Sequence, residues 1–200
     1  MLVTVAAHKG GVAKTTSSVH IAAALQLDAP TLLIDEEGAG ATDWAEHGLL
    51  PFETVLESEA AQRYGQYQHH VIDTGARITP ALLQSLSGSS DFLVIPTTPD
   101  ALALSALVKM LEALRALDQR RYGILLTIAP PRPSRDAEDA RAVLSEDLGL
   151  PVLETVIPRA VAYQKAALAG VTVDQVKDPR AAEAWSAYQG AVKEIRERVR

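Results

Sequence analysis

The amino-acid sequence predicts an α/β fold, with a mostly parallel β-sheet covered by helices on both faces. Short apolar runs rich in β-branched residues alternate with amphipathic helical segments along the whole chain. These runs are continuously apolar, which is typical of strands buried on both faces of a parallel sheet. With 48% hydrophobic residues among 200, the chain suits one domain with a sizeable core. We therefore expect a single α/β domain over residues 1–200.

Six of the apolar runs predict strands, and they lie at residues 2–7, 31–35, 70–73, 92–96, 122–128 and 152–157. A first helix is expected to include residues 17–25, and five amphipathic helices are expected near residues 79–87, 100–118, 134–148, 159–169 and 179–198. Asp100 is placed to cap the start of one helix, and Gly170 is placed to cap the end of another.

Composition excludes several classes of protein. No stretch of about 18 apolar residues is present, so no transmembrane helix is expected. Cysteine is absent, which fits a reducing cytoplasm and removes any cysteine-ligated iron–sulfur cluster. The net charge of −6 is unevenly distributed: residues 1–108 hold four Lys/Arg and twelve Asp/Glu, whereas residues 109–200 hold fifteen and thirteen. Contacts with polyanions are therefore expected from the second half of the chain.

A glycine-bearing loop lies between the first strand and the first helix, with the sequence Lys9-Gly10-Gly11-Val12-Ala13-Lys14-Thr15-Thr16. Loop amides and the positive end of the helix dipole converge there, and such an arrangement binds phosphate groups. Paired glycines let the backbone approach the phosphate closely. Lys14 would reach the β- and γ-phosphates, and the Thr15 hydroxyl would ligate Mg²⁺. The alternative interpretation is a glycine turn that binds nothing.

The loop departs from the common phosphate-loop pattern G-x-x-x-x-G-K-[ST], because His8 and Ala13 stand at the two glycine positions. It matches the variant x-K-G-G-x-x-K-[ST]. The loop therefore resembles the deviant Walker A motif of the ParA/MinD family of ATPases. The resemblance implies that residues 9–16 bind ATP and that Lys14 is catalytic. It also implies that Lys9 crosses a dimer interface to touch the nucleotide of the partner.

Two carboxylates, Asp35 and Asp73, close predicted strands. Ligands of such sheets lie beyond the carboxyl ends of the strands, so both carboxylates can converge on Lys14, although aspartates at strand ends are also common turn residues. The run Val71-Ile72-Asp73-Thr74 resembles the Walker B end of the same family, with Gly75 in place of the proline. The resemblance implies a magnesium shell built from Thr15, Asp35 and Asp73.

The segment after the second strand departs from the D-x-D-P-Q pattern of the family, whose acidic residues position the attacking water and the magnesium shell. Here it is Asp35-Glu36-Glu37-Gly38-Ala39-Gly40. The first aspartate is kept as Asp35, Glu37 replaces the second with one more methylene, and the Pro-Gln pair is lost. Because water positioning depends on ångström geometry, Glu37 either takes over this catalytic role with slow hydrolysis, or hydrolysis is impaired. Glu36 and Glu37 as solvated loop charges are the third possibility.

The run from Ile157 to Ala166 resembles the segment that frames the adenine in this family. The resemblance implies that Pro158 and Arg159 contact the adenine side of the nucleotide.

The resemblance covers nearly the whole chain and is greatest to the short ParA-type partition ATPases. It implies an ATP-dependent homodimer that binds DNA without sequence preference and positions or segregates plasmids, chromosomes or other cargo. A cargo-bound ParB-like protein would stimulate hydrolysis, and the protein would be cytoplasmic and nucleoid-associated when ATP-bound. Such DNA binding needs a basic strip, for which the candidates are Arg115, Arg120, Arg121, Arg132, Arg135, Arg141, Lys193, Arg196, Arg198 and Arg200. Acidic residues are interleaved with these basic residues, so the alternative is that they form solvated helix faces that do not bind DNA.

Three other functions stay open. A MinD-like protein that cycles on the membrane needs a C-terminal amphipathic helix with more apolar area than Val192, Ile195 and Val199 offer, so no membrane binding is expected. An ATP-dependent small-molecule ligase would need a second, substrate-binding pocket, for which the sequence shows no constellation. A nucleotide-binding interaction switch with impaired hydrolysis is kept open by the departure at Glu37.

Overall fold

A seven-stranded sheet forms the centre of the molecule in the computed structural model, which describes residues 1–75, 80–116 and 121–200. The strand order is β3-β2-β4-β1-β5-β6-β7, and the pairings between neighbours are parallel. The strands are β1 (Leu2–Val5), β2 (Thr31–Asp35), β3 (Glu53–Leu56), β4 (His69–Asp73), β5 (Phe92–Thr97), β6 (Tyr122–Ala129) and β7 (Val152–Pro158).

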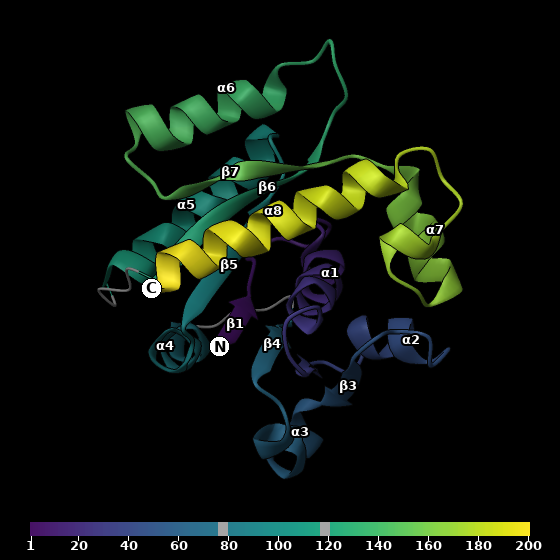
Figure 1. Cartoon of the computed structure of the whole chain (residues 1–200). Coiled ribbons are helices and arrows are strands. Elements are labelled where there is room, and N and C mark those ends of the chain that lie inside the picture. The colour runs from purple at the N-terminus through teal and green to yellow at the C-terminus, as the bar shows by residue number, and fades with distance from the viewer. Residues whose placement is uncertain (76–79, 117–120) are drawn as a thin grey trace.

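Helices cover both faces of the sheet (Figure 1). One hydrophobic cluster packs α1 (Lys14–Gln26), α7 (Val161–Ala169) and α8 (Ala181–Val199) on one face. A second cluster packs α5 (Ala101–Ala116) and α6 (Asp136–Ala142) on the other face. The remaining elements are α2 (Ala41–Ala45), α3 (Glu57–Arg63), α4 (Pro80–Ser89), the π-helical turn η2 (Val143–Asp147) and the 3₁₀ turns η1 (Tyr64–Gln66) and η3 (Val173–Gln175). No helix in the described ranges is long and apolar enough to cross a membrane.

The predicted α/β class and the six predicted strands are confirmed, but β3, α2 and α3 were missed. β3 is a four-residue edge strand in which only Val55 is buried, so it lacks the apolar run that marks the other strands. The helix expected over residues 134–148 is divided, because α6 passes into the π-helical turn at Val143. The helices expected near 79–87 and 100–118 correspond to α4 and α5; residues 79, 117 and 118 lie outside the described residues.

The strand order places the ends of β1, β2 and β4 next to one another. In the register of the sheet, Asp73 pairs with Asp35 on one side and with Val5 on the other. The loop that follows β1 therefore begins beside Asp73, and Asp35 lies one strand further along the sheet. This arrangement puts the predicted site residues at the carboxyl ends of the strands, where ligands of parallel sheets bind.

His20 fastens α1 to the segment that precedes α8. Its imidazole is fully buried and stacks on Tyr188, with ring centroids 5.0 Å apart. Nε2 accepts the backbone N–H of Val173 at 3.0 Å, so Nδ1 carries the proton and donates to the carbonyl oxygen of Thr16 at 2.7 Å. Burial lowers the pKa of His20 from 6.5 to about 4, although the hydrogen bond to Thr16 opposes this.

We expect acid to destabilise the fold through His20. The unfolded chain binds the proton near pH 6.5, whereas the folded chain binds it only near pH 4, so the unfolded state gains protons first. The contribution of neutral His20 is complete above pH 6.5 and is lost as the pH falls toward about 4. Urea unfolding across this range should show the loss in the wild type and a flatter profile in His20→Gln. Equal slopes for both proteins would contradict this prediction.

Candidate nucleotide-binding site

The loop between β1 and α1 has a strained backbone at its end. Gly11 has a φ of 76° and Ala13 a φ of 61°, both in the left-handed region. Ala13 stands where the common phosphate loop has glycine, and an L-residue in this conformation costs about 1 kcal/mol. Strain of this kind is concentrated at functional sites, where the surrounding fold maintains it. A Cβ on Gly10 or Gly11 would meet no atom within 4 Å, so both glycines lie on the open side of the loop.

Three side chains from the first turns of α1 gather around Asp73 at the end of β4. Thr15 donates its hydroxyl to one carboxylate oxygen of Asp73, and Ser18 donates to the other, each at 2.8 Å. Lys14 Nζ lies 3.6 Å from Asp73 Oδ1 and also donates to the carbonyl oxygen of Thr74. The structure thus brings together Lys14, Thr15 and Asp73, and it adds Ser18, which the sequence analysis missed.

Asp73 has the environment of a carboxylate that benefits from a cation. It is only 2% exposed, and burial raises the pKa of its carboxyl above the ordinary value, although Lys14 and the two hydroxyls oppose this shift. A metal ion that replaces the proton at such a group relieves the cost of the buried charge. The Thr15 hydroxyl and the Asp73 carboxylate are oxygen ligands of the kind that Mg²⁺ takes, with phosphates and water as the remaining ligands. Within the described ranges, no group of three or more His, Asp or Glu could hold a metal by itself.

Asp35 organises the loop that follows β2. One of its oxygens accepts the N–H groups of Glu37 and Gly38 at 3.1 Å, and the other accepts the N–H and the hydroxyl of Thr42 at 2.9 and 2.8 Å. Burial opposes the charge, but these hydrogen bonds outweigh it, and the pKa of Asp35 lies below its ordinary value. Four donors fill the acceptor positions of a carboxylate. The catalytic and metal roles expected for Asp35 stay predictions, whereas its structural role is direct.

The same loop returns over Thr15 and Asp73. At Gly40, with a φ of 135°, a Cβ would lie 3.0 Å from Thr15 Oγ1 and 3.8 Å from Asp73 Oδ2. Glu36 accepts the backbone N–H of Gly75 at 2.6 Å, and the side chain of Glu37 lies against the same glycine. Glu36 is therefore more than a solvated loop charge, whereas Glu37 is exposed to solvent on its other side. The catalytic role expected for Glu37 stays a prediction.

Lys9 is held outside the cluster formed by Lys14 and Asp73. Its Nζ lies 3.2 Å from Asp100 Oδ1, and both side chains are partly exposed. Asp100 also accepts the N–H of Ala103 at 3.0 Å, which confirms it as the N-cap of α5. Hydrogen bonds from Thr98 and Ala103, together with Lys9, lower the pKa of Asp100 to about 2. An exposed ion pair contributes little stability, so Lys9 can exchange Asp100 for a phosphate at small cost.

A hollow of ≈ 320 Å³ lies beside the phosphate-type loop, at the end of β7. Pro158 and Arg159 line it on one side, and Gly11, Ala13 and Thr16 line it on the other. The two residues expected on the adenine side therefore border a cavity that opens onto the loop. Their contact with a base stays a prediction.

Thr127 and Ile128 on β6 are further residues that the sequence analysis missed. The buried hydroxyl of Thr127 lies 3.0 Å from the carbonyl oxygen of Val12 and 3.1 Å from that of Thr97, and it donates to both in a shared hydrogen bond. It thereby ties the loop to β5 and β6. Ile128 has a φ of 52°, which is a genuine outlier for a β-branched residue, and it lines the hollow beside Gly11. The sequence signal that could have indicated Thr127 is its hydroxyl within an otherwise apolar strand.

Comparisons with known proteins agree with this geometry. The model of the CobQ/CobB/MinD/ParA nucleotide binding domain matches residues 3–173. Maintenance of carboxysome distribution protein A of Gloeobacter kilaueensis is 33% identical over 195 residues, which cover 94% of this chain and 90% of the relative. The protein of the same name from Halothiobacillus neapolitanus is 30% identical over 183 residues, 84% of each chain. The solved ATP complex of a Cyanothece McdA shares the fold, with a TM-score of 0.76, 16% identity and coverage of 98% of this chain and 96% of that one.

We expect Thr127→Val to weaken nucleotide binding. The substitution keeps the side-chain shape but removes the hydrogen bond to the Val12 carbonyl, a loss of about 1 kcal/mol or about fivefold in affinity. Equilibrium titration with a fluorescent nucleotide measures the effect. Thr54→Val is the matched control, because the hydroxyl of Thr54 on β3 is buried and has no hydrogen-bond partner among the described residues. Unchanged affinity in Thr127→Val, or an equal loss in the control, would contradict the assigned role.

Proposed function

Because the chain belongs to the CobQ/CobB/MinD/ParA family of nucleotide-binding domains, we propose that it is a dimerising ATPase that positions cargo, with carboxysomes as the cargo class. The observation that carries the proposal is the cluster of Lys14, Thr15 and Asp73 at the N-terminus of α1, with Lys9 held outside it. This combination supplies one lysine for the chain's own nucleotide and a second that remains available.

The residues at the loop fit Mg-ATP. Loop amides and Lys14 suit phosphates, and Thr15 with Asp73 suits the magnesium ion. When bound, Mg²⁺ would neutralise charge on the β- and γ-phosphates. Pro158 and Arg159 would border the base in the hollow at the end of β7. Glu37, which lies against Gly75 beside the Lys14–Thr74 contact, would orient the attacking water.

In the proposed function, Lys9 couples nucleotide binding to dimerisation. Its ion pair with Asp100 lies on the surface and is easily exchanged. In the ATP-bound homodimer, Lys9 would leave Asp100 and bind the nucleotide of the partner, so that dimerisation reports the state of the nucleotide. Slow hydrolysis, accelerated by a cargo-bound protein in the role of a ParB-like partner, would return the chain to the monomer.

The cargo is proposed from the two curated relatives. Both are named for the maintenance of carboxysome distribution, and each aligns with at least 84% of this chain. This favours a carboxysome over the plasmid or chromosome cargo that the short ParA type suggests. We expect the protein in the cytoplasm, and on the nucleoid when ATP is bound.

DNA binding is proposed for the end of α8. Acidic neighbours balance the charge of three of the other basic candidates: Arg132 and Arg135 pair with Glu138, and Arg141 pairs with Glu154. Arg120 and the side chain of Arg115 lie outside the described part of the structure. Lys193 and Arg200 make no ion pair with the residues that the structure describes.

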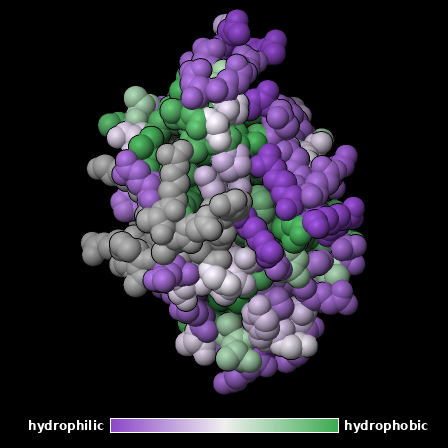
Figure 2. Space-filling view, turned by 90° about the vertical axis from the view of Figure 1, so that its left-hand side faces the viewer, coloured by the Kyte–Doolittle hydropathy of each residue, from purple (hydrophilic) through white to green (hydrophobic). Residues whose placement is uncertain are grey.

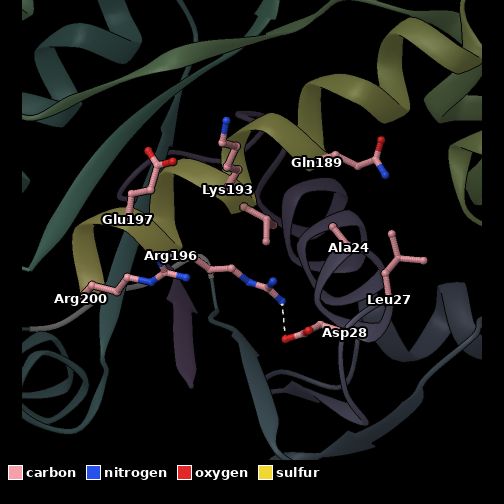
Figure 3. Close-up of a pocket in the computed structure, with 9 residues that line it drawn as sticks. Ala24, Leu27, Asp28, Gln189, Lys193, Arg196, Glu197 and Arg200 are labelled. Carbon is pink, nitrogen blue, oxygen red and sulfur yellow. Dashed lines mark hydrogen bonds and ion pairs between the residues drawn. The ribbon is translucent and has the colours of Figure 1, made fainter.

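Lys193 and Arg200 line a groove of ≈ 520 Å³ between α8 and the C-terminal end of α1 (Figure 3). Arg196 reaches toward α1 and pairs with Asp28 at 3.0 Å, and Glu197 adds a negative charge to the rim. The side of the molecule where α8 ends faces the viewer in Figure 2, and hydrophilic side chains cover much of it. One chain offers only a weak site, but a dimer that doubles it would bind DNA more tightly through the release of counterions.

We expect binding to random-sequence duplex DNA with Mg-ATP and little binding with ADP or no nucleotide. The double variant Lys193→Glu/Arg200→Glu should bind more weakly, with a salt slope smaller by about 1 for each phosphate that the protein no longer neutralises. The control Arg132→Glu/Arg135→Glu makes the same change of charge at residues already paired with Glu138. Fluorescence anisotropy across a salt series measures DNA binding by all three proteins.

Equal DNA binding in every nucleotide state would contradict the switch, and an equal loss in the control would contradict the α8 site. Absence of DNA binding with dimerisation still dependent on ATP would support the second candidate, an interaction switch that acts away from DNA. The unusual Asp35-Glu36-Glu37 segment is the observation that favours this second candidate, because impaired hydrolysis would leave a binding module.

A further inference from the structure

Gly75, the residue after Thr74 at the end of β4, contacts both glutamates of the loop that follows β2. Its N–H donates to Glu36 Oε2 at 2.6 Å, a short distance typical of a hydrogen bond to a charged acceptor. The side chain of Glu37 lies over its Cα, where a Cβ would be 2.7 Å from Glu37 Cδ and 2.8 Å from Glu37 Cγ. Real Cβ atoms do not approach other atoms so closely. The side chain of Glu37 can lie in this place only because residue 75 has no Cβ.

We propose that Gly75 is a positioning residue for ATP hydrolysis: its bare Cα and its N–H hold the Glu36–Glu37 pair against the segment that contacts Lys14. This inference rests on the proposed ATPase function. Glu37 is the group that would orient the attacking water, and Gly75 acts through it.

The backbone of the two glutamates is fixed, which gives their side chains a defined reach. Glu36 N–H donates to the carbonyl oxygen of Asp73 at 3.1 Å, and Glu37 N–H donates to Asp35 Oδ1 at 3.1 Å. The loop is thus attached to the ends of β2 and β4. With both attachment points set, a side chain at residue 75 would take space that the side chain of Glu37 now occupies.

Gly75 also lies next to the part of the site where the β- and γ-phosphates would bind. The carbonyl oxygen of the preceding residue, Thr74, accepts a hydrogen bond from Lys14, which would bind the β- and γ-phosphates. A carboxylate displaced by a methyl group at residue 75 would move relative to those phosphates. A misplacement of about 1 Å can cost about 100-fold in rate.

The steric conflict is removable, which makes the proposal testable by a double-mutant cycle. The atoms that a Cβ at residue 75 would meet belong to the end of a flexible side chain, so Gly75→Ala should displace Glu37 and leave the fold intact. Glu37→Ala removes Cγ, Cδ and the carboxylate of residue 37, which hold the atoms that a Cβ at residue 75 would meet. An alanine at residue 75 should then meet no obstacle from those atoms.

Turnover of Mg-ATP, its KM and the nucleotide affinity are measured for the wild type, Gly75→Ala, Glu37→Ala and the double variant. We expect Gly75→Ala to lower turnover by about 10- to 100-fold when Glu37 is present, with KM and affinity changed by less than about threefold. In the Glu37→Ala background, the same substitution should change the residual turnover by less than about twofold. Gly65→Ala is the control, since a Cβ there meets no atom within 4 Å and the residue lies in η1, away from the site.

An equal fold-loss from Gly75→Ala in both backgrounds, or no loss when Glu37 is present, would overturn the proposal. A second readout separates it from the proposed function. The carboxyl carbon resonance of Glu37 and the amide resonance of Gly75 are followed by NMR in the protein with ADP and Mg²⁺. We expect Gly75→Ala to shift the Glu37 resonance and Glu36→Gln to shift the Gly75 amide. If the wild type shows no turnover, the ATPase function fails, and unshifted resonances would then overturn the positioning contact as well.

Discussion

The buried carboxylate of Asp73 is the interaction on which the rest of the site depends. Thr15 and Ser18, from the first turns of α1, donate to its two oxygens, and Lys14 lies beside it. These contacts fix the N-terminus of α1 against the end of β4, and they therefore set the direction in which the loop amides point. Burial makes the charge costly, and Lys14 alone does not offset that cost, since the pKa of Asp73 remains raised. The site is thus built to receive a cation and the phosphates that accompany it.

A second loop completes the site from the neighbouring strand, and Asp35 holds this loop in shape. Four hydrogen bonds to its carboxylate give Asp35 a structural role in this loop, and the side chains of Glu36 and Glu37 lie against Gly75, just after β4. The longer Glu37 and the glycine at residue 75 are then two parts of one packing arrangement. Departures from a motif that look independent along the sequence are in contact in the folded chain.

The sequence was sufficient for the fold class, because buried parallel strands leave apolar runs, and β2, β5 and β6 each show one clearly. It was also sufficient to place a glycine-bearing loop between β1 and α1, whose backbone is left-handed at Gly11 and Ala13. β3 was missed because an edge strand needs little apolar surface, and only one of its residues is buried. The Ser18–Asp73, Thr127–Val12 and Glu36–Gly75 contacts were missed because the two residues of each pair are 39 or more positions apart along the chain. Periodicity carries no information about such pairs, which depend on strand order and register.

The most direct test of the central claim is the mass of the protein in solution with Mg-ATP, with Mg-ADP and without nucleotide. Sedimentation or light scattering should show a dimer for the wild type only with ATP. Lys9→Ala should bind ATP and remain a monomer, because the lysine paired with Asp100 would be missing from the interface. Lys14→Ala should neither bind nor dimerise. A wild type with the same mass in all three states, or an ATP-dependent dimer of Lys9→Ala, would contradict the nucleotide-controlled switch.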